Sequence, residues 1–164
     1  MTRFCNIAFF AAIALITTGF GSCQQRHLDG EGIVINEVCG KDNDGLEWIE
    51  IGNASDKSIN LKGYKLWKMD TEGIDKKLYN FPDTTLAPHT LFTINAEDLR
   101  ARIPYKKAVI VELYNANEDL IDSFDSSEDL DAESHPLGGS YARIPNLTGE
   151  WAVTNHATWE EANK

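Results

Sequence analysis

The sequence predicts an all-β fold, a sandwich or barrel of short strands. Three observations predict it: short apolar runs follow one another along the chain, turn-forming Gly, Asn, Asp or Pro residues separate most of them, and apolar and polar residues alternate within several runs. The 164 residues are 42% hydrophobic and 25% charged, which suits one folded domain with a core. The candidate strands are residues 33–38, 46–52, 58–61, 64–69, 77–81, 90–94, 108–114, 120–124 and 141–144.

The run 64–69 alternates between two faces. Tyr64 and Leu66 share one face, which we expect to point toward the core. The other face carries Lys65, Trp67 and Met69. An exposed tryptophan on a strand is typical of contact with a sugar or a protein, so these three residues are the predicted ligand contact. In the alternative reading, the loop 70–76 covers Trp67.

A hairpin and one helix are also predicted. Residues 115–118 form a plausible tight connection between the runs 108–114 and 120–124, so these runs are expected to pair. A short helix is expected near residues 96–102, where it would cover one end of the sandwich. Its signals are the capping residue Asn95, an acid at the third helical position, and a proline that stops it, Pro104.

The first 22 residues resemble a bacterial lipoprotein signal. Arg3 precedes an apolar run, 7–16, which covers about 15 Å as a helix and is too short to span a membrane. Small residues then lead to Cys23, where such a signal is cut and the thiol takes up diacylglycerol. The alternative is ordinary secretory cleavage near Ser22, which leaves Cys23 as a plain thiol.

The resemblance to a lipoprotein signal predicts where the protein is located. Residues 23–31 are polar and read as a flexible tether between the lipid and the domain. Gln24 follows the cysteine, and a residue other than Asp there favours the outer membrane in enteric-type sorting. We therefore expect a lipid-anchored protein of the cell envelope, in the outer membrane, with the side of the membrane left open.

Charge and composition exclude several functions. The formal net charge of −11 argues against a nucleic-acid binder, which needs a basic surface. The four histidines lack the spacing of a zinc site, and Ser140 lacks the Gly-x-Ser-x-Gly context of a nucleophile. We therefore expect that the protein binds no cofactor and is not an enzyme. The competing hypothesis is a small hydrolase or its accessory subunit, which would need an acid–histidine or metal cluster in a deep pocket.

Two acidic segments are candidate calcium sites. Asp42, Asp44 and Glu47 resemble the start of a calcium-binding loop, although the full pattern is absent and a plain turn explains the same residues. Residues 118–133 are rich in Asp and Glu, which suits calcium, a basic partner or a solvated loop. These segments keep open the hypothesis of a calcium-dependent structural module.

Several sequence fragments occur in an order typical of a known family. They are 33–38 (IVINEV), 47–53 (EWIEIGN), 60–66 (NLKGYKL), 79–82 (YNFP), 86–89 (LAPH), 120–124 (LIDSF), 140–145 (SYARIP) and 148–151 (TGEW). The series resembles the lamin tail domain family, the immunoglobulin-like domain of nuclear lamins that also occurs in secreted bacterial proteins. It implies a domain over residues 32–156, followed by a C-terminal tail, 157–164.

The resemblance also implies a fold and a function. It implies an immunoglobulin-like Greek-key sandwich of two antiparallel sheets with about 8–9 strands, no catalytic residues, and an interaction or adhesion role. Glu37, Glu50 and Asn53 then read as structural polar groups, with a ligand or metal cluster as the alternative. Together these inferences predict a lipid-anchored envelope protein that presents a non-catalytic module to a protein or glycan partner.

Overall fold

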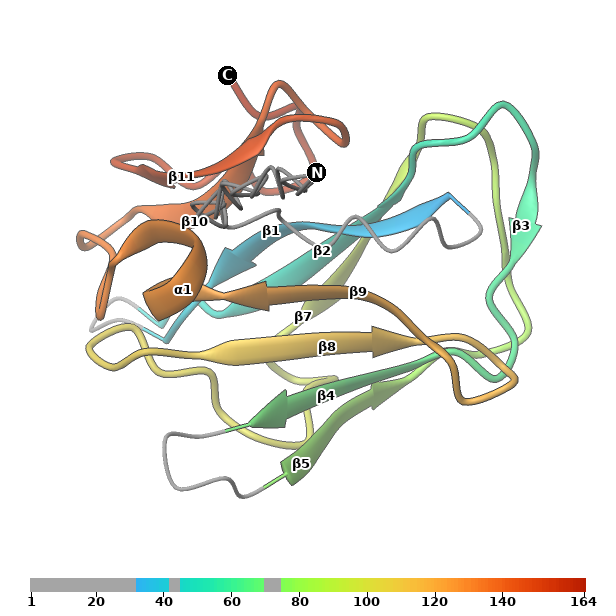
Figure 1. Cartoon of the computed structure of the whole chain (residues 1–164), viewed down its shortest axis with the longest axis horizontal. Helices are drawn as coiled ribbons and strands as arrows, with labels where there is room; N and C mark the ends of the chain where they lie inside the picture. Colours follow the sequence, from blue (N-terminus) through green and yellow to red (C-terminus); the bar gives the residue numbers. More distant parts are fainter. Residues whose placement is uncertain (1–31, 42–44, 70–74) are drawn as a thin grey trace, which may run out of the picture.

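The computed structural model describes residues 32–41, 45–69 and 75–164 (Figure 1). Within these ranges the chain forms eleven strands and one five-residue helix. The elements are β1 (Ile33–Cys39), β2 (Trp48–Asn53), β3 (Ile59–Asn60), β4 (Lys65–Met69), β5 (Asp75–Asn80), β6 (Thr85–Leu86), β7 (Leu91–Asn95), β8 (Ile110–Tyr114), β9 (Leu120–Asp125), α1 (Ser126–Leu130), β10 (Ser140–Ile144) and β11 (Glu150–Thr154).

The strands form two main antiparallel sheets. One sheet has the order β11-β10-β1-β2-β7, the other has the order β5-β4-β8-β9, and the short strands β3 and β6 pair with each other. β1 lies between β2 and β10, so the first and last parts of the domain meet in one sheet (Figure 1). The predicted all-β, immunoglobulin-like class is confirmed, and the predicted hairpin is the β8–β9 pair.

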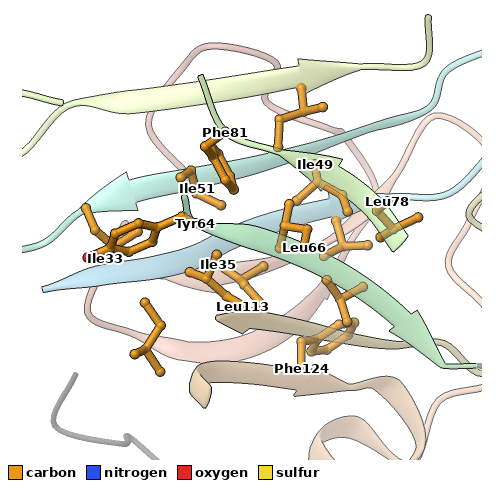
Figure 2. Packing of buried hydrophobic residues seen from close by; sticks show 14 of the residues in the cluster. Ile33, Ile35, Ile49, Ile51, Tyr64, Leu66, Leu78, Phe81, Leu113 and Phe124 are labelled. Atoms are coloured by element: carbon orange, nitrogen blue, oxygen red, sulfur yellow. The ribbon is translucent and has the colours of Figure 1, made fainter. Parts of the chain in front are cut away.

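The core lies between the two sheets (Figure 2). Ile35 and Ile51 reach it from the five-stranded sheet, and Leu66, Leu113 and Phe124 reach it from the other; all five are fully buried. Burial alternates along β4 as the sequence predicts, because successive side chains of a strand point to opposite faces.

The outer face of β1 and β2 is also covered, so both strands are buried along their whole length. The loop that follows β10 packs Leu147 on Gly52, where an added Cβ would lie 2.0 Å from the leucine. Residues 157–164 cover the same face further along, with Asn163 buried and its side-chain amide donating to the carbonyl oxygens of Asn36 and Arg143 at 3.2 and 3.1 Å. The segment beyond the expected domain boundary is therefore packed against the sandwich.

The predicted helix near residues 96–102 is wrong. Residues 96–98 form a turn in which the N–H groups of Asp98 and Leu99 donate to the carbonyl of Asn95, and the N–H of Arg100 then donates to Leu78. The capping signal at Asn95 closes one turn only, because a helix this short is unstable unless packing supports it, and the backbone here is engaged by β5 instead.

The one helix of the described residues is α1, which lies in the acidic stretch that follows β9. Asp125 caps it by accepting hydrogen bonds from the N–H groups of Ser127 and Glu128, at 2.9 and 3.3 Å. Two acids, Glu128 and Asp129, lie in its first turn, where the helix dipole favours negative charge. In the part of the chain that the structure describes, no helix is long and apolar enough to cross a membrane.

Candidate binding face

The outer face of the four-stranded sheet contains the predicted ligand contact. Lys65, Trp67 and Met69 are half-buried and alternate along β4 with the buried Leu66 and Lys68. The structure therefore places the three predicted residues together on the face that points away from the core. Most of the loop 70–76 that would cover Trp67 lies outside the described residues, and its final two residues belong to β5.

The strand register sets the neighbours of Trp67. Lys77 of β5 lies opposite it on one side and Glu112 of β8 on the other. The Lys77 ammonium lies 5.0 Å from the centre of the Trp67 ring, a cation–π contact. Lys65, one row further along, forms an ion pair with Glu118 and lies opposite Tyr114. This face therefore combines aromatic rings with charges of both signs.

A hollow of about 240 Å³ opens on this face. Its walls are Trp67, Asp75, Glu112, Tyr114 and Glu118. The Tyr114 hydroxyl donates a 2.7 Å hydrogen bond to the Glu112 carboxylate. Partial burial, that hydrogen bond and the charges of Glu112 and Asp75 raise the pKa of Tyr114 to about 12, so the phenol is neutral at physiological pH.

Glu37 and Glu50 lie side by side on the covered face of the five-stranded sheet, as partners in the β1–β2 register. Glu37 accepts hydrogen bonds from the hydroxyl of Ser140 and from both the N–H and the hydroxyl of Thr158. Glu50 accepts from the Asn36 amide at 2.8 Å and from the Thr93 hydroxyl at 3.2 Å. Burial raises the pKa of Glu37, and burial together with the nearby Glu37 charge raises that of Glu50 to about 7.

Asn53 organises the loops at the far end of β2. Its amide group donates to the carbonyls of Lys57, Leu86 and Ala87, and its oxygen accepts from the N–H and hydroxyl of Ser55. The polar atoms of Glu37, Glu50 and Asn53 thus bind the protein's own backbone and side chains, which supports the structural interpretation of all three.

The predicted calcium loop falls mostly outside the described residues, as do Asp42 and Asp44. Glu47 is described: it is buried, and its carboxylate accepts a 2.6 Å hydrogen bond from the N–H of Ile103. Among residues 32–41, 45–69 and 75–164, no group of three His, Cys, Asp or Glu side chains is placed to hold a metal ion. Cys23 and the segments 1–22 and 23–31 also lie outside the described ranges.

A second hollow, of about 400 Å³, was not anticipated from the sequence. Its walls are Gly45, Leu46, Glu47, Trp48, Asn95, Ala96, Glu97 and Trp159. Trp159 is 51% exposed and donates its indole N–H to the side chain of Asn95 at 3.1 Å. The only signal in the sequence is a tryptophan in a polar C-terminal stretch, and its docking beside β7 follows from tertiary contacts.

A buried ion pair joins the two sheets, and sequence reasoning missed it too. Arg143 of β10 contacts both carboxylate oxygens of Asp122 of β9 at 3.1 and 3.2 Å, and donates to the carbonyl of Ile35 at 2.8 Å. Asp122 in turn accepts the Ile35 N–H at 2.7 Å. Charged residues inside otherwise apolar strands were the available signal, because a buried charge requires a partner.

The fold and these sites together define a class of protein. It is an immunoglobulin-like sandwich whose buried acids are hydrogen-bonded within the protein and whose outer sheet face carries half-buried aromatic residues beside charged ones. Residues 29–128 match the family model described as Lamin Tail Domain. The chain therefore belongs to the lamin tail domain family. β10, β11 and the C-terminal segment lie beyond the matched residues. No curated protein matches the sequence.

Proposed function

We propose that this protein is a lipid-anchored component of the cell envelope that presents its lamin tail domain as a non-catalytic binding module, with the ligand contact around Trp67. The observation that supports it best is the outer face of the four-stranded sheet, where Trp67 and Tyr114 lie with carboxylates around one hollow. Trp67 projects from β4, and Glu112 and Tyr114 project from β8, so these three side chains lose little conformational entropy on binding.

A binding role also agrees with the family and with the polar groups. Lamin tail domains are immunoglobulin-like interaction modules, and the fold by itself names no ligand. A hydrolase would need to expose acids to its substrate. The buried acids among the described residues are instead hydrogen-bonded within the protein: Glu37, Glu47, Glu50 and Asp122. Anchoring is supported by the sequence around Cys23, whose acyl chains would hold the module at a membrane.

The binding role is tested by capture from envelope extracts and from a glycan array. The full protein, purified in detergent, is immobilised beside its Trp67→Ala variant and a control, Trp159→Ala. We expect the Trp67 variant to lose captured ligand while its melting temperature stays close to that of the parent protein, because Trp67 lies outside the core. Equal capture by the parent protein and the Trp67 variant would contradict the proposed contact face.

A further inference from the structure

The size of the hollow beside Trp67 restricts what it accommodates. Its volume is about 240 Å³, and sites for drug-sized molecules start at roughly 300 Å³. The hollow therefore suits a single side chain or a group of similar size better than an oligosaccharide. Its two aromatic walls, Trp67 and Tyr114, come from adjacent strands, β4 and β8, so their spacing is set by the sheet.

The charge of the walls restricts the ligand further. Three of the five wall residues are carboxylates: Asp75, Glu112 and Glu118. The faces of aromatic rings are also negative, so both kinds of wall side chain attract cations. The two neighbouring lysines lie at the margin, Lys65 paired with Glu118 and Lys77 over the Trp67 ring. The contact of Lys77 shows that this tryptophan accepts a cation within the fold itself.

We propose that the hollow binds a cationic side chain, arginine in preference to lysine, presented by a basic segment of a partner protein. This inference rests on the proposed function, because it names the ligand of the same face. A guanidinium group stacks on aromatic rings and forms paired hydrogen bonds to carboxylates, and both kinds of wall are present here. The protein's net charge of −11 also draws basic partners toward it.

Competing ligands fit the walls less well. A phosphate or other anion would face three carboxylates. A neutral sugar would find ring faces and hydrogen-bond acceptors, but it would bring no positive charge to the carboxylates of Asp75 and Glu112. The charge and the size of the hollow therefore both favour a positively charged side chain.

The test follows the indole N–H resonance of Trp67 by NMR in the full protein, in detergent micelles, with the signal assigned through Trp67→Phe. The probes are three blocked peptides, Gly-Arg-Gly, Gly-Lys-Gly and Gly-citrulline-Gly; citrulline has nearly the shape of arginine without its charge. We expect a saturable shift with the arginine peptide, a smaller one with lysine and none with citrulline. We expect the affinity to fall as salt rises from about 50 mM to about 500 mM, because ions screen exposed charges.

A pair of matched variants tests the carboxylates. Glu112→Gln keeps an oxygen to accept the Tyr114 hydrogen bond but removes the charge, and we expect it to weaken the arginine peptide about fivefold. Glu97→Gln, an exposed acid at the other hollow, serves as the control and leaves the affinity unchanged. Comparable melting temperatures for both variants would show that the fold is intact.

Equal shifts with the arginine and citrulline peptides would overturn the inference, and so would no shift of the Trp67 resonance with any peptide. Saturation of that resonance by a neutral oligosaccharide alone would also overturn it, in favour of a sugar. These failures are distinct from a failure of the proposed function. If Trp67→Ala still abolishes capture from envelope extracts or glycans, the contact face stands and only the identity of its ligand changes.

Discussion

Among the described residues, four carboxylates are buried: those of Glu37, Glu47, Glu50 and Asp122. Glu47 accepts the N–H of Ile103, and the other three differ in the partners that compensate their burial. Asp122 is neutralised by Arg143, although burial remains the largest influence and raises the pKa of the carboxyl. Glu37 is held by three hydrogen bonds from Ser140 and Thr158. Glu50 accepts from amide and hydroxyl donors but has no cation beside it among the described residues, and its pKa rises to about 7. Its ionisation is therefore coupled to stability.

The pH dependence of stability follows from Glu50. Its pKa in the folded protein, about 7, lies above its usual value of 4.5, so the folded state binds the proton more tightly. The stabilisation is complete below about pH 4.5 and is lost as the pH rises through about 7. We expect Glu50→Gln to remove a decrease of roughly 1–3 kcal/mol in the free energy of unfolding between about pH 5 and about pH 8.

Urea unfolding at several pH values checks this expectation, with Glu97→Gln as the control. Glu97 is an exposed acid in the turn after β7, so its variant should keep the slope of the parent protein. Glu37 and Asp122 also have raised pKa values, so part of the slope remains in Glu50→Gln. A slope identical to that of the parent protein would mean that Glu50 titrates as a solvated acid.

At the scale of elements, the C-terminal segment acts as a cover for the five-stranded sheet. Thr158 bonds Glu37 through its N–H at 3.0 Å and through its hydroxyl, and the hydroxyl also contacts Asn163. Asn163 reaches the backbone of β1 and β10. The cover supplies the donors that the buried acids beneath it require, so the strand pair and the segment depend on each other.

Thr158→Val removes one donor to Glu37 while keeping the shape of the side chain. We expect a loss of about 1–3 kcal/mol in the free energy of unfolding, because the carboxylate stays buried with one partner fewer. Thermal or urea unfolding measures the loss. The matched control is Thr148→Val, at an exposed position, which should change stability by less than about 0.5 kcal/mol. A similar effect in both variants would contradict the role of Thr158.

At the scale of the whole molecule, the two sheets are joined by both packing and a polar link. Arg143 and Asp122 connect β10 to β9, and both residues bond the backbone of Ile35 in β1. The ion pair thus joins β9, an edge strand of one sheet, to β10, an inner strand of the other, while the edge strands β5 and β7 have no such link among the described residues. The proposed binding face lies on β4, β5 and β8, away from this link.

The proposed anchor is also a property of the whole molecule. We expect mass spectrometry of the N-terminus to show acylation at Cys23 with residues 1–22 removed. Cys23→Ala should move the protein from the membrane fraction to the soluble fraction, because two or more acyl chains are needed for stable anchoring. Cys5→Ala, within the expected signal, is the control and should leave the membrane fraction unchanged. An unmodified Cys23 in the mature protein would exclude the lipid anchor.

Local sequence patterns predict most of the sandwich, and particular residues show where such patterns fail. The alternation of apolar and polar residues predicts the correct faces for Leu66 and Trp67 of β4, because it depends only on adjacent positions. It also predicts the burial of Tyr64, which directly precedes that strand. The hairpin β8–β9 was predicted because its connection is short. The prediction of a helix at 96–102 is wrong because the capping signal at Asn95 is local. It carries no information about the competing hydrogen bond from the N–H of Arg100 to the carbonyl of Leu78. β11 was missed because its burial depends on β10.

The buried face of each strand follows from the order of residues alone, since side chains alternate along any extended backbone. The sites do not. Trp67 meets Lys77 and Glu112, and Glu37 meets Thr158, 121 positions away, through strand pairing and chain docking. Strand pairing uses backbone N–H and C=O groups that nearly every residue possesses, so local sequence carries little information about which strands become neighbours. Which strands become neighbours is determined by the packing of all the apolar faces into one core.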